Sequence, residues 1–217
     1  MGPFVTDQTV LNIAHRGGGG ERPESTLEAF RHAVSVGADV LELDVHLSRD
    51  GVLIVSHDED VMRVCGRPER IAELDAREIQ RMDAGALWSP DGATTPFAGR
   101  GLYLPRLDEL FQALPDAQLN IEIKVEDPRA VQELVRLIRR FRREEHTVCA
   151  SFFPRQLRRL RRDAPVIATS AHPGDVRRFL MLSRLRVAGL AGNRVPYLQV
   201  PEYHGSLKVV DERFLRD

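Results

Sequence analysis

Short runs of apolar residues alternate along the chain with longer segments in which apolar residues recur every three or four positions. The short runs are typical of buried β-strands, and the longer segments are typical of amphipathic helices. The predicted strands are 11–15, 39–47, 119–125, 147–151, 166–170 and 197–200, with a short return strand at 52–56. The first predicted helix is capped by Ser25 or Thr26 and ended by Gly37. The others are 107–114, 128–143, 154–162, 174–187 and one that begins near Asp211.

Residues 59–106 are the least regular part of this pattern. They contain one helical stretch, at about 72–83, and a loop rich in Gly, Pro and Thr. We interpret this segment as a small insertion over one end of the fold, after the second strand.

Repeated strand–helix units predict an α/β fold with a parallel sheet. Polar residues cluster where the strands end, which favours a (β/α)₈ TIM-type barrel, because the active site of that fold lies at the carboxyl ends of its strands. Residues 1–217 then form a single barrel domain. Only six of the eight barrel strands are found, so we expect the C-terminal strands seven and eight to be missing from this chain. A fragment, a wall supplied by a partner, and a different closure of the sheet all remain open.

The strand at 39–47 and the strand at 119–125 each carry charged residues on one face. Glu42 and Asp44 alternate with apolar residues, as do Glu122 and Lys124, and strand residues alternate between two faces. Three carboxylates inside a barrel mouth repel one another unless positive charge lies among them. An oxygen-rich cluster without thiols suits one divalent cation, Mg²⁺ or Ca²⁺, better than zinc. The alternative is a set of inward ion pairs with Lys124 or an Arg.

Two histidines end strands close to these carboxylates in the predicted fold. His15 ends the first strand and His57 ends the return strand. Because imidazole titrates near neutral pH, the pair suggests a general acid and a general base. Arg16 offers a planar set of donors that matches a phosphate, and Gly17–Gly20 allow the backbone to approach a ligand.

Several motifs together identify a family resemblance. They are H-R-G, P-E-S-T eight residues from that His, G-A-D-V-L-E-L-D-V-x-L-S-x-D-G-V-L-I-V-S-H-D, and N-I-E-I-K. Together they resemble the glycerophosphodiester phosphodiesterase family, which implies metal-dependent hydrolysis of glycerophosphodiesters to sn-glycerol 3-phosphate and an alcohol. The resemblance also implies a role for each site residue: a metal at Glu42, Asp44 and Glu122, acid–base catalysis by His15 and His57, phosphate binding by Arg16 and Lys124, and Glu24 in the supporting shell of the substrate site.

The chain departs from the family pattern at two places. Ser25 replaces the usual Asn of P-E-N-T, and the later segments V-W-T-V-N and G-V-D-G-I-x-T-D are not found. Two alternatives therefore stay open. One is a phosphodiesterase resembling lysophospholipase D or sphingomyelinase D, and the other is an inactive truncated barrel that serves as a binding module.

The charge and composition of the chain argue against nucleic acids and membranes as partners. The net charge is −1, and the arginine runs at 139–143 and 158–162 lack interleaved aromatics, so we expect solvated helix faces and no nucleic acid. Cys65 and Cys149 form no disulfide framework, and the sequence shows no signal peptide and no membrane-spanning run. We therefore expect a cytoplasmic protein without stable membrane insertion. Its expected ligand is a small glycerophosphodiester or lysophospholipid, and its oligomeric state is left open.

Overall fold

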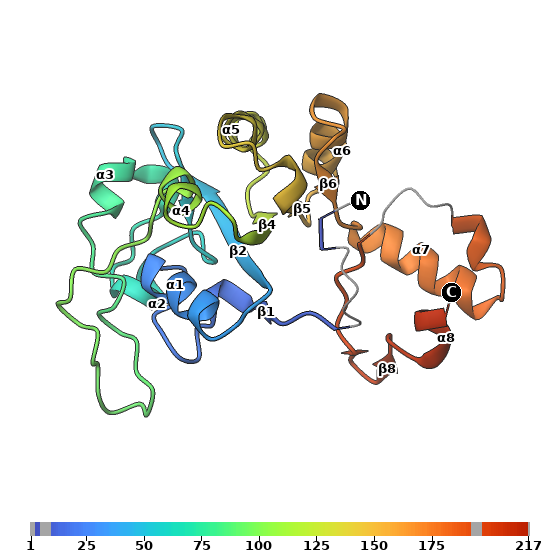
Figure 1. The fold of residues 1–217 in the computed structure, drawn as a ribbon, viewed down its shortest axis with the longest axis horizontal. Helices are drawn as coiled ribbons and strands as arrows, with labels where there is room; N and C mark the ends of the chain where they lie inside the picture. Colours follow the sequence, from blue (N-terminus) through green and yellow to red (C-terminus); the bar gives the residue numbers. More distant parts are fainter. Residues whose placement is uncertain (1–2, 5–9, 192–196, 217) are drawn as a thin grey trace.

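The computed structural model describes residues 3–4, 10–191 and 197–216, and it contains one mostly parallel sheet (Figure 1). The strand order is β1-β2-β4-β5-β6, and β3 pairs with β2 in the antiparallel direction. The strands are β1 Ile13–Ala14, β2 Val40–Leu47, β3 Leu53–Val55, β4 Gln118–Ile123, β5 Thr147–Ala150 and β6 Ala168–Thr169. The main helices are α1 Leu27–Ser35, α4 Leu107–Ala113, α5 Pro128–Arg140, α6 Pro154–Asp163, α7 Pro173–Arg184 and α8 Glu212–Arg216.

The core lies between one face of this sheet and the helices that follow its strands. Leu43 of β2 and Ile121 of β4 are fully buried there, against Phe30 of α1, Leu110 of α4 and Leu134 of α5. The apolar residues of both strands thus point outward to the helices, as their alternation predicts. The strand–helix order and this packing confirm the TIM-type α/β fold class.

Local capping explains where two of the helices begin. The Thr26 hydroxyl accepts a hydrogen bond from the Ala29 backbone N–H at 3.2 Å, which satisfies one free donor of α1. At α5, Asp127 accepts a hydrogen bond from the Arg129 backbone N–H at 2.8 Å, and Pro128 occupies the first helical position.

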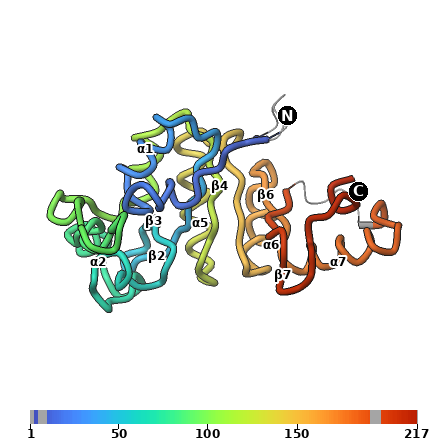
Figure 2. Tube along the Cα trace, turned by 90° about the horizontal axis from the view of Figure 1, so that it is seen from below, coloured from blue at the N-terminus to red at the C-terminus, as the bar shows by residue number. Residues whose placement is uncertain are grey.

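The 59–106 segment has its own small apolar cluster. It contains α2 Met62–Cys65, the 3₁₀ turn η2 Ile71–Glu73 and α3 Ala76–Ile79. The predicted helix at 72–83 was wrong in length, because only a 3₁₀ turn and a four-residue helix form there. In both overall views this segment and α7 lie at opposite ends of the molecule (Figures 1 and 2).

The predicted strand at 197–200 was also wrong. Within the described residues, only Tyr197 pairs there, in a single parallel bridge to Ser170. An antiparallel hairpin of β7 Tyr203–His204 and β8 Leu207–Lys208 follows. The described part of the sheet is therefore open, with β1 at one end and β6 and its bridge at the other. None of the described helices combines the length and the hydropathy needed to cross a bilayer.

Candidate active site

Strands β2 and β4 bring three carboxylates together. Asp44 and Glu122 are directly paired in the parallel register, and Glu42 precedes Asp44 by two positions on the same face. Each of the three offers one oxygen, and these oxygens all lie within 4.8 Å of one another. Because the Asp44 side chain is only 1% exposed, this cluster is enclosed by protein on most sides.

Lys124 places positive charge beside the cluster. Its Nζ lies 3.1 Å from Asp44 Oδ1 and 3.0 Å from Glu122 Oε2. Burial alone would lower the pKa of Lys124, but the charges of Asp44 and Glu122 outweigh it and raise the pKa. The inward ion pairs that the sequence allowed are therefore present, yet one lysine cannot neutralise three carboxylates.

The remaining carboxylate oxygens suit a hard cation. Asp44 Oδ2 and Glu122 Oε1 are buried and have no hydrogen-bond partner among the described residues. Burial, reinforced by the charge of Asp44, raises the pKa of Glu42 to about 7. Clustered, partly unsatisfied carboxylate oxygens without sulfur fit Mg²⁺ or Ca²⁺.

The end of β1 presents His15 and Arg16 to the cluster from the 3₁₀ turn η1 His15–Gly17. Arg16 has a left-handed backbone with φ of 53°, and its backbone N–H donates to Glu42 Oε2 at 3.0 Å. The His15 side chain is 70% exposed, and its Nε2 lies 3.9 Å from the same oxygen. Partial burial and the charge of Arg16 lower the pKa of His15, which favours its neutral form.

The return strand β3 brings His57 back to the level of the carboxylates. The backbone N–H of Ser56 donates to the Asp44 carbonyl at 3.0 Å, so the next residue lies beside the middle of β2. His57 Nδ1 lies 2.6 Å from Asp58 Oδ1, and this contact orients the imidazole. His46, on the same face of β2, hydrogen-bonds through Nε2 to the His57 carbonyl at 3.0 Å and supports the loop.

Glu24 contacts two arginines. Its Oε1 accepts from Arg16 Nη1 at 3.2 Å, and Arg63 of α2 donates to both of its oxygens. Burial alone would raise the pKa of Glu24, but the hydrogen bonds and charges of the two arginines hold it below its usual value. Arg63 was missed in the sequence because it lies in the irregular segment, outside every strand-end cluster.

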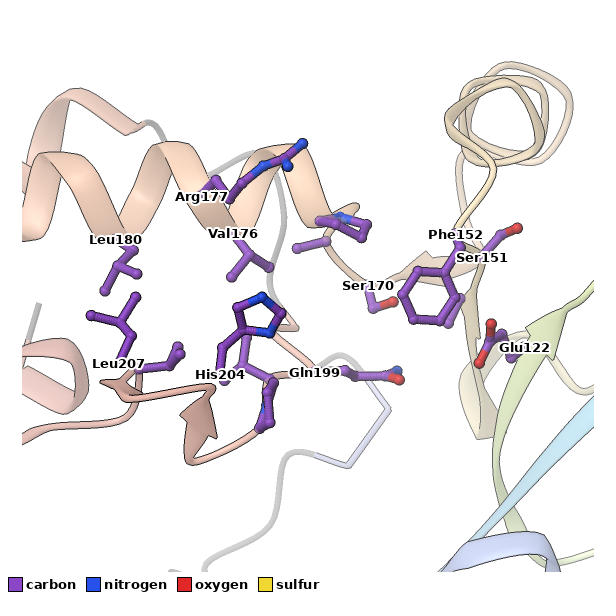
Figure 3. Close-up of a pocket in the computed structure, with 16 residues that line it drawn as sticks. Glu122, Ser151, Phe152, Ser170, Val176, Arg177, Leu180, Gln199, His204 and Leu207 are labelled. Atoms are coloured by element: carbon purple, nitrogen blue, oxygen red, sulfur yellow. The ribbon is translucent and has the colours of Figure 1, made fainter.

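A cavity of about 510 Å³ opens beside Glu122, and no local pattern in the sequence indicated it. Figure 3 shows Glu122 at one end of this cavity and Leu180 and Leu207 at the other. Phe152 lies between them and places its ring centroid 5.8 Å from Lys124 Nζ. The cavity thus joins a charged end to an apolar end.

Contacts of 4 Å or less connect every predicted site residue into one group, with His57 joined through Asp58 and Arg63. Lys124 contacts Asp44 and Glu122, the Arg16 side chain lies 3.9 Å from Asp44, and Glu42 accepts from the Arg16 backbone N–H. Glu24 joins through Arg16. His15 contacts the cluster through Glu42, whereas His57 contacts Asp58. The arrangement combines a candidate cation site, two positively charged side chains and two imidazoles, which are the groups that phosphate-ester cleavage requires.

Comparisons with known proteins point to the same chemistry. A lysophospholipase D of Homo sapiens is 38% identical over 137 residues, which cover 63% of this chain and 43% of that protein. A glycerophosphodiester phosphodiesterase of Caldanaerobacter subterraneus subsp. tengcongensis is 37% identical over 147 residues, covering 65% of this chain and 58% of that protein. The chain thus spans about half the length of these curated relatives.

The solved structures include a glycerophosphodiester phosphodiesterase from Agrobacterium tumefaciens str. C58. It is 31% identical to this chain, with a TM-score of 0.66, and the match covers 75% of this chain and 67% of that one. The family model described as the glycerophosphoryl diester phosphodiesterase family matches residues 15–217. This chain therefore belongs to the glycerophosphoryl diester phosphodiesterase family.

Proposed function

We propose that this protein hydrolyses glycerophosphodiesters to sn-glycerol 3-phosphate and an alcohol, with one divalent cation held by Glu42, Asp44 and Glu122. The supporting observation is the cluster itself, since three inward carboxylates lie within 4.8 Å of one another beside Lys124 and Arg16. We also propose that residues 1–217 act as one domain in which 59–106 is an insertion.

In this reaction the side chains of the site have separate roles. Arg16 and Lys124 bind the phosphoryl oxygens and stabilise their negative charge as it increases. One imidazole of His15 and His57 removes the proton of the attacking oxygen, and the other protonates the departing alcohol. Glu24 holds Arg16 in place. When bound, the divalent cation would supply further positive charge at the phosphoryl group.

A coupled assay tests this proposal. Purified protein is incubated with glycerophosphocholine, and sn-glycerol 3-phosphate is measured with Mg²⁺, with Ca²⁺ and with EDTA. We expect release of product with at least one cation, and loss of that release in EDTA and in the Glu122→Gln variant. Glu145→Gln is the matched control, because Glu145 is exposed and lies far from the cluster in η3 Glu144–His146. Hydrolysis that survives both EDTA and Glu122→Gln contradicts the proposal.

The cavity favours a second candidate, hydrolysis of lysophospholipids. An amphipathic substrate needs a polar site for its phosphate and an apolar site for its chain. Glu122 lies at one end of the cavity, and Val176, Leu180 and Leu207 line the other (Figure 3). A relative named for lysophospholipase D activity, at 38% identity, also supports this candidate.

The two substrates separate these candidates. Leu180→Asp introduces a charge into the apolar end of the cavity, so it should impair turnover of lysophosphatidylcholine and spare turnover of glycerophosphocholine. Met181→Asp is the control, because Met181 is exposed at the next position of α7 and does not line the cavity. Equal effects of Leu180→Asp on both substrates count against an acyl-chain site.

A further inference from the structure

Arg63, in α2, makes hydrogen bonds with two carboxylates from distant parts of the chain. Its Nε donates to Asp58 Oδ2 at 2.6 Å. Its Nη1 and Nη2 donate to the two oxygens of Glu24 at 2.7 and 2.8 Å, in a bidentate pair. One planar guanidinium therefore fixes both carboxylates at once.

Each of these carboxylates also contacts a side chain that the proposed function uses. Asp58 Oδ1 lies 2.6 Å from His57 Nδ1, and Glu24 Oε1 accepts from Arg16 Nη1 at 3.2 Å. Arg63 thus connects the imidazole of the acid–base pair with the arginine that faces the phosphate, although it contacts neither side chain itself.

The environment of this network separates it from an ordinary surface ion pair. Arg63 is 47% exposed, and an isolated pair with such exposure contributes little to folding stability. The Glu24 side chain, however, is only 17% exposed, and three short hydrogen bonds share one donor group. The same hydrogen bonds and charges outweigh burial and keep the pKa values of Glu24 and Asp58 low, so both remain ionised acceptors at neutral pH.

We propose that Arg63 is a positioning residue for the phosphodiesterase reaction. It fixes Asp58, which holds His57 with its proton on Nδ1 and leaves Nε2 for proton transfer, and it fixes Glu24, which restrains Arg16. This inference rests on the proposed function for its kinetic consequence, but the tautomer of His57 can be observed without any substrate. The insertion thereby supplies part of the active site.

The first test is kinetic and uses glycerophosphocholine with the full chain. Misplacing a catalytic group by about 1 Å can cost about 10²-fold in rate, so we expect Arg63→Met to lower kcat by about 10–10²-fold. Arg63→Lys keeps the charge without the planar fork and should retain more activity. Arg70→Met is the matched control, because Arg70 makes an exposed ion pair with Glu59 at 2.7 Å in the same segment and hydrogen-bonds neither Glu24 nor Asp58.

A double-mutant cycle tests the connection through Asp58. We expect Arg63→Met to lower kcat less in an Asp58→Asn background than in wild type, because the connection to His57 is already broken there and only the connection through Glu24 remains. Urea unfolding of each variant shows whether it is folded under assay conditions. If Arg63 had a purely structural role, the loss of kcat would instead be proportional to the loss of unfolding free energy in both Arg63→Met and Arg70→Met.

The second test is independent of activity. In ¹⁵N NMR spectra of the histidine rings, His57 should carry its proton on Nδ1 in the neutral form, with His57→Gln used for assignment. We expect Arg63→Met and Arg63→Lys to shift this ring towards the other tautomer, and Arg70→Met to leave it unchanged. An unchanged His57 tautomer together with unchanged kcat in folded Arg63→Met overturns the inference. If wild-type protein hydrolyses nothing but the tautomer shifts, the proposed function fails while the positioning by Arg63 stands.

Discussion

The Glu42 carboxyl shows how burial at this site affects stability. Its pKa is raised to about 7, chiefly by burial and then by the charge of Asp44. Between pH 4.5 and 7 the folded state therefore binds more protons at this residue than the unfolded state does, so the free energy of unfolding decreases as pH rises through that window. Well above pH 7 the Glu42 carboxyl is ionised in both states, and the full destabilisation caused by its buried charge applies.

Glu42→Gln should remove this penalty from the cation-free protein. The variant should be more stable than wild type at pH 8 by up to about 3 kcal/mol, and the difference should shrink towards pH 5. Urea unfolding in EDTA at the two pH values measures it, with Glu145→Gln as the exposed control. A Glu42→Gln variant that is no more stable than wild type at pH 8 contradicts the electrostatic assignment.

The imidazoles make a second prediction at this scale. His15→Ala and His57→Ala should each lower kcat for glycerophosphocholine by about 10²–10⁴-fold, because proton transfer is then left to water. His146→Ala is the control, since His146 hydrogen-bonds Gln118 at 3.1 Å, before the start of β5 and away from the carboxylates. Near-normal turnover in either active-site variant removes that residue from the acid–base pair.

Individual site residues were predictable where one strand face is buried. Alternation alone placed Glu42 and Asp44 opposite the apolar core, and the same argument placed Glu122 beside them. Contacts between loops follow no such period. The pair of Glu24 with Arg63 spans 39 positions and depends on how the insertion folds back, so no local pattern indicates it.

Among the elements, the turn after β1 depends on a close packing contact with α1. Gly17 has φ of 78°, and a Cβ placed there would approach Phe30 Cδ1 to 2.9 Å. Gly18 has a similar φ of 82°, but a Cβ there would meet nothing within 4 Å. A side chain at either position would strain the backbone, but only at Gly17 would it also meet a close neighbour.

Gly17→Ala should therefore destabilise the protein more than Gly18→Ala. Left-handed backbone strain of about 1–3 kcal/mol applies to both variants, and the clash with Phe30 adds to it only in Gly17→Ala. Urea unfolding of both variants measures the difference. Equal destabilisation would show that Phe30 moves aside without cost.

Elements with an uninterrupted apolar period were predicted better than irregular ones, for a physical reason. The helix expected at 128–143 has several turns of apolar periodicity, and α5 forms at 128–140. The stretch 72–83 is divided at Asp75, whose backbone N–H donates to Glu78 Oε2 where α3 begins, and 197–200 offers only a few strand residues. Tertiary contacts therefore decide the conformation of both. The strands of the β7–β8 hairpin have only two residues each, which is too short to show an alternation of apolar and polar residues.

For the whole molecule, a cation held by the carboxylate cluster would couple ligand binding to folding. The site draws on β2 and β4, so its three side chains come together only in the folded chain. A cation that binds the folded state alone adds about 2.7 kcal/mol to the free energy of unfolding at a concentration of 100 times its Kd.

Mg²⁺ or Ca²⁺ should thus raise the unfolding midpoint of wild-type protein relative to EDTA, at matched ionic strength. Asp44→Asn should abolish this rise, and Glu145→Gln should preserve it. Thermal unfolding at increasing cation concentration measures the effect. A midpoint that is insensitive to both cations contradicts the assigned ligands.

At this scale the sequence predicted the class of fold but not the extent of the sheet. The order of strands and helices indicated parallel pairing, and the register of β2 with β4 follows it over six residue pairs. Sheet extent depends on edge pairing, which single-strand patterns do not encode. The described sheet accordingly has five parallel strands and one bridge where six strands were expected.

The segment 59–106 is hydrogen-bonded to the loop after β1 at two places. Trp88 donates from Nε1 to the Gly19 carbonyl at 2.9 Å, and Arg63 donates to both carboxylate oxygens of Glu24. Segments joined by such hydrogen bonds tend to open as one cooperative unit. Local unfolding of the loop that contains Gly19 and Glu24 should therefore also break its bonds to Trp88 and Arg63. Amide hydrogen exchange should therefore give residues 17–24 and the parts of 59–106 around Arg63 and Trp88 a common opening free energy, distinct from that of α7. Entry of a ligand past this loop would then be governed by the opening of a segment that contributes none of the three clustered carboxylates.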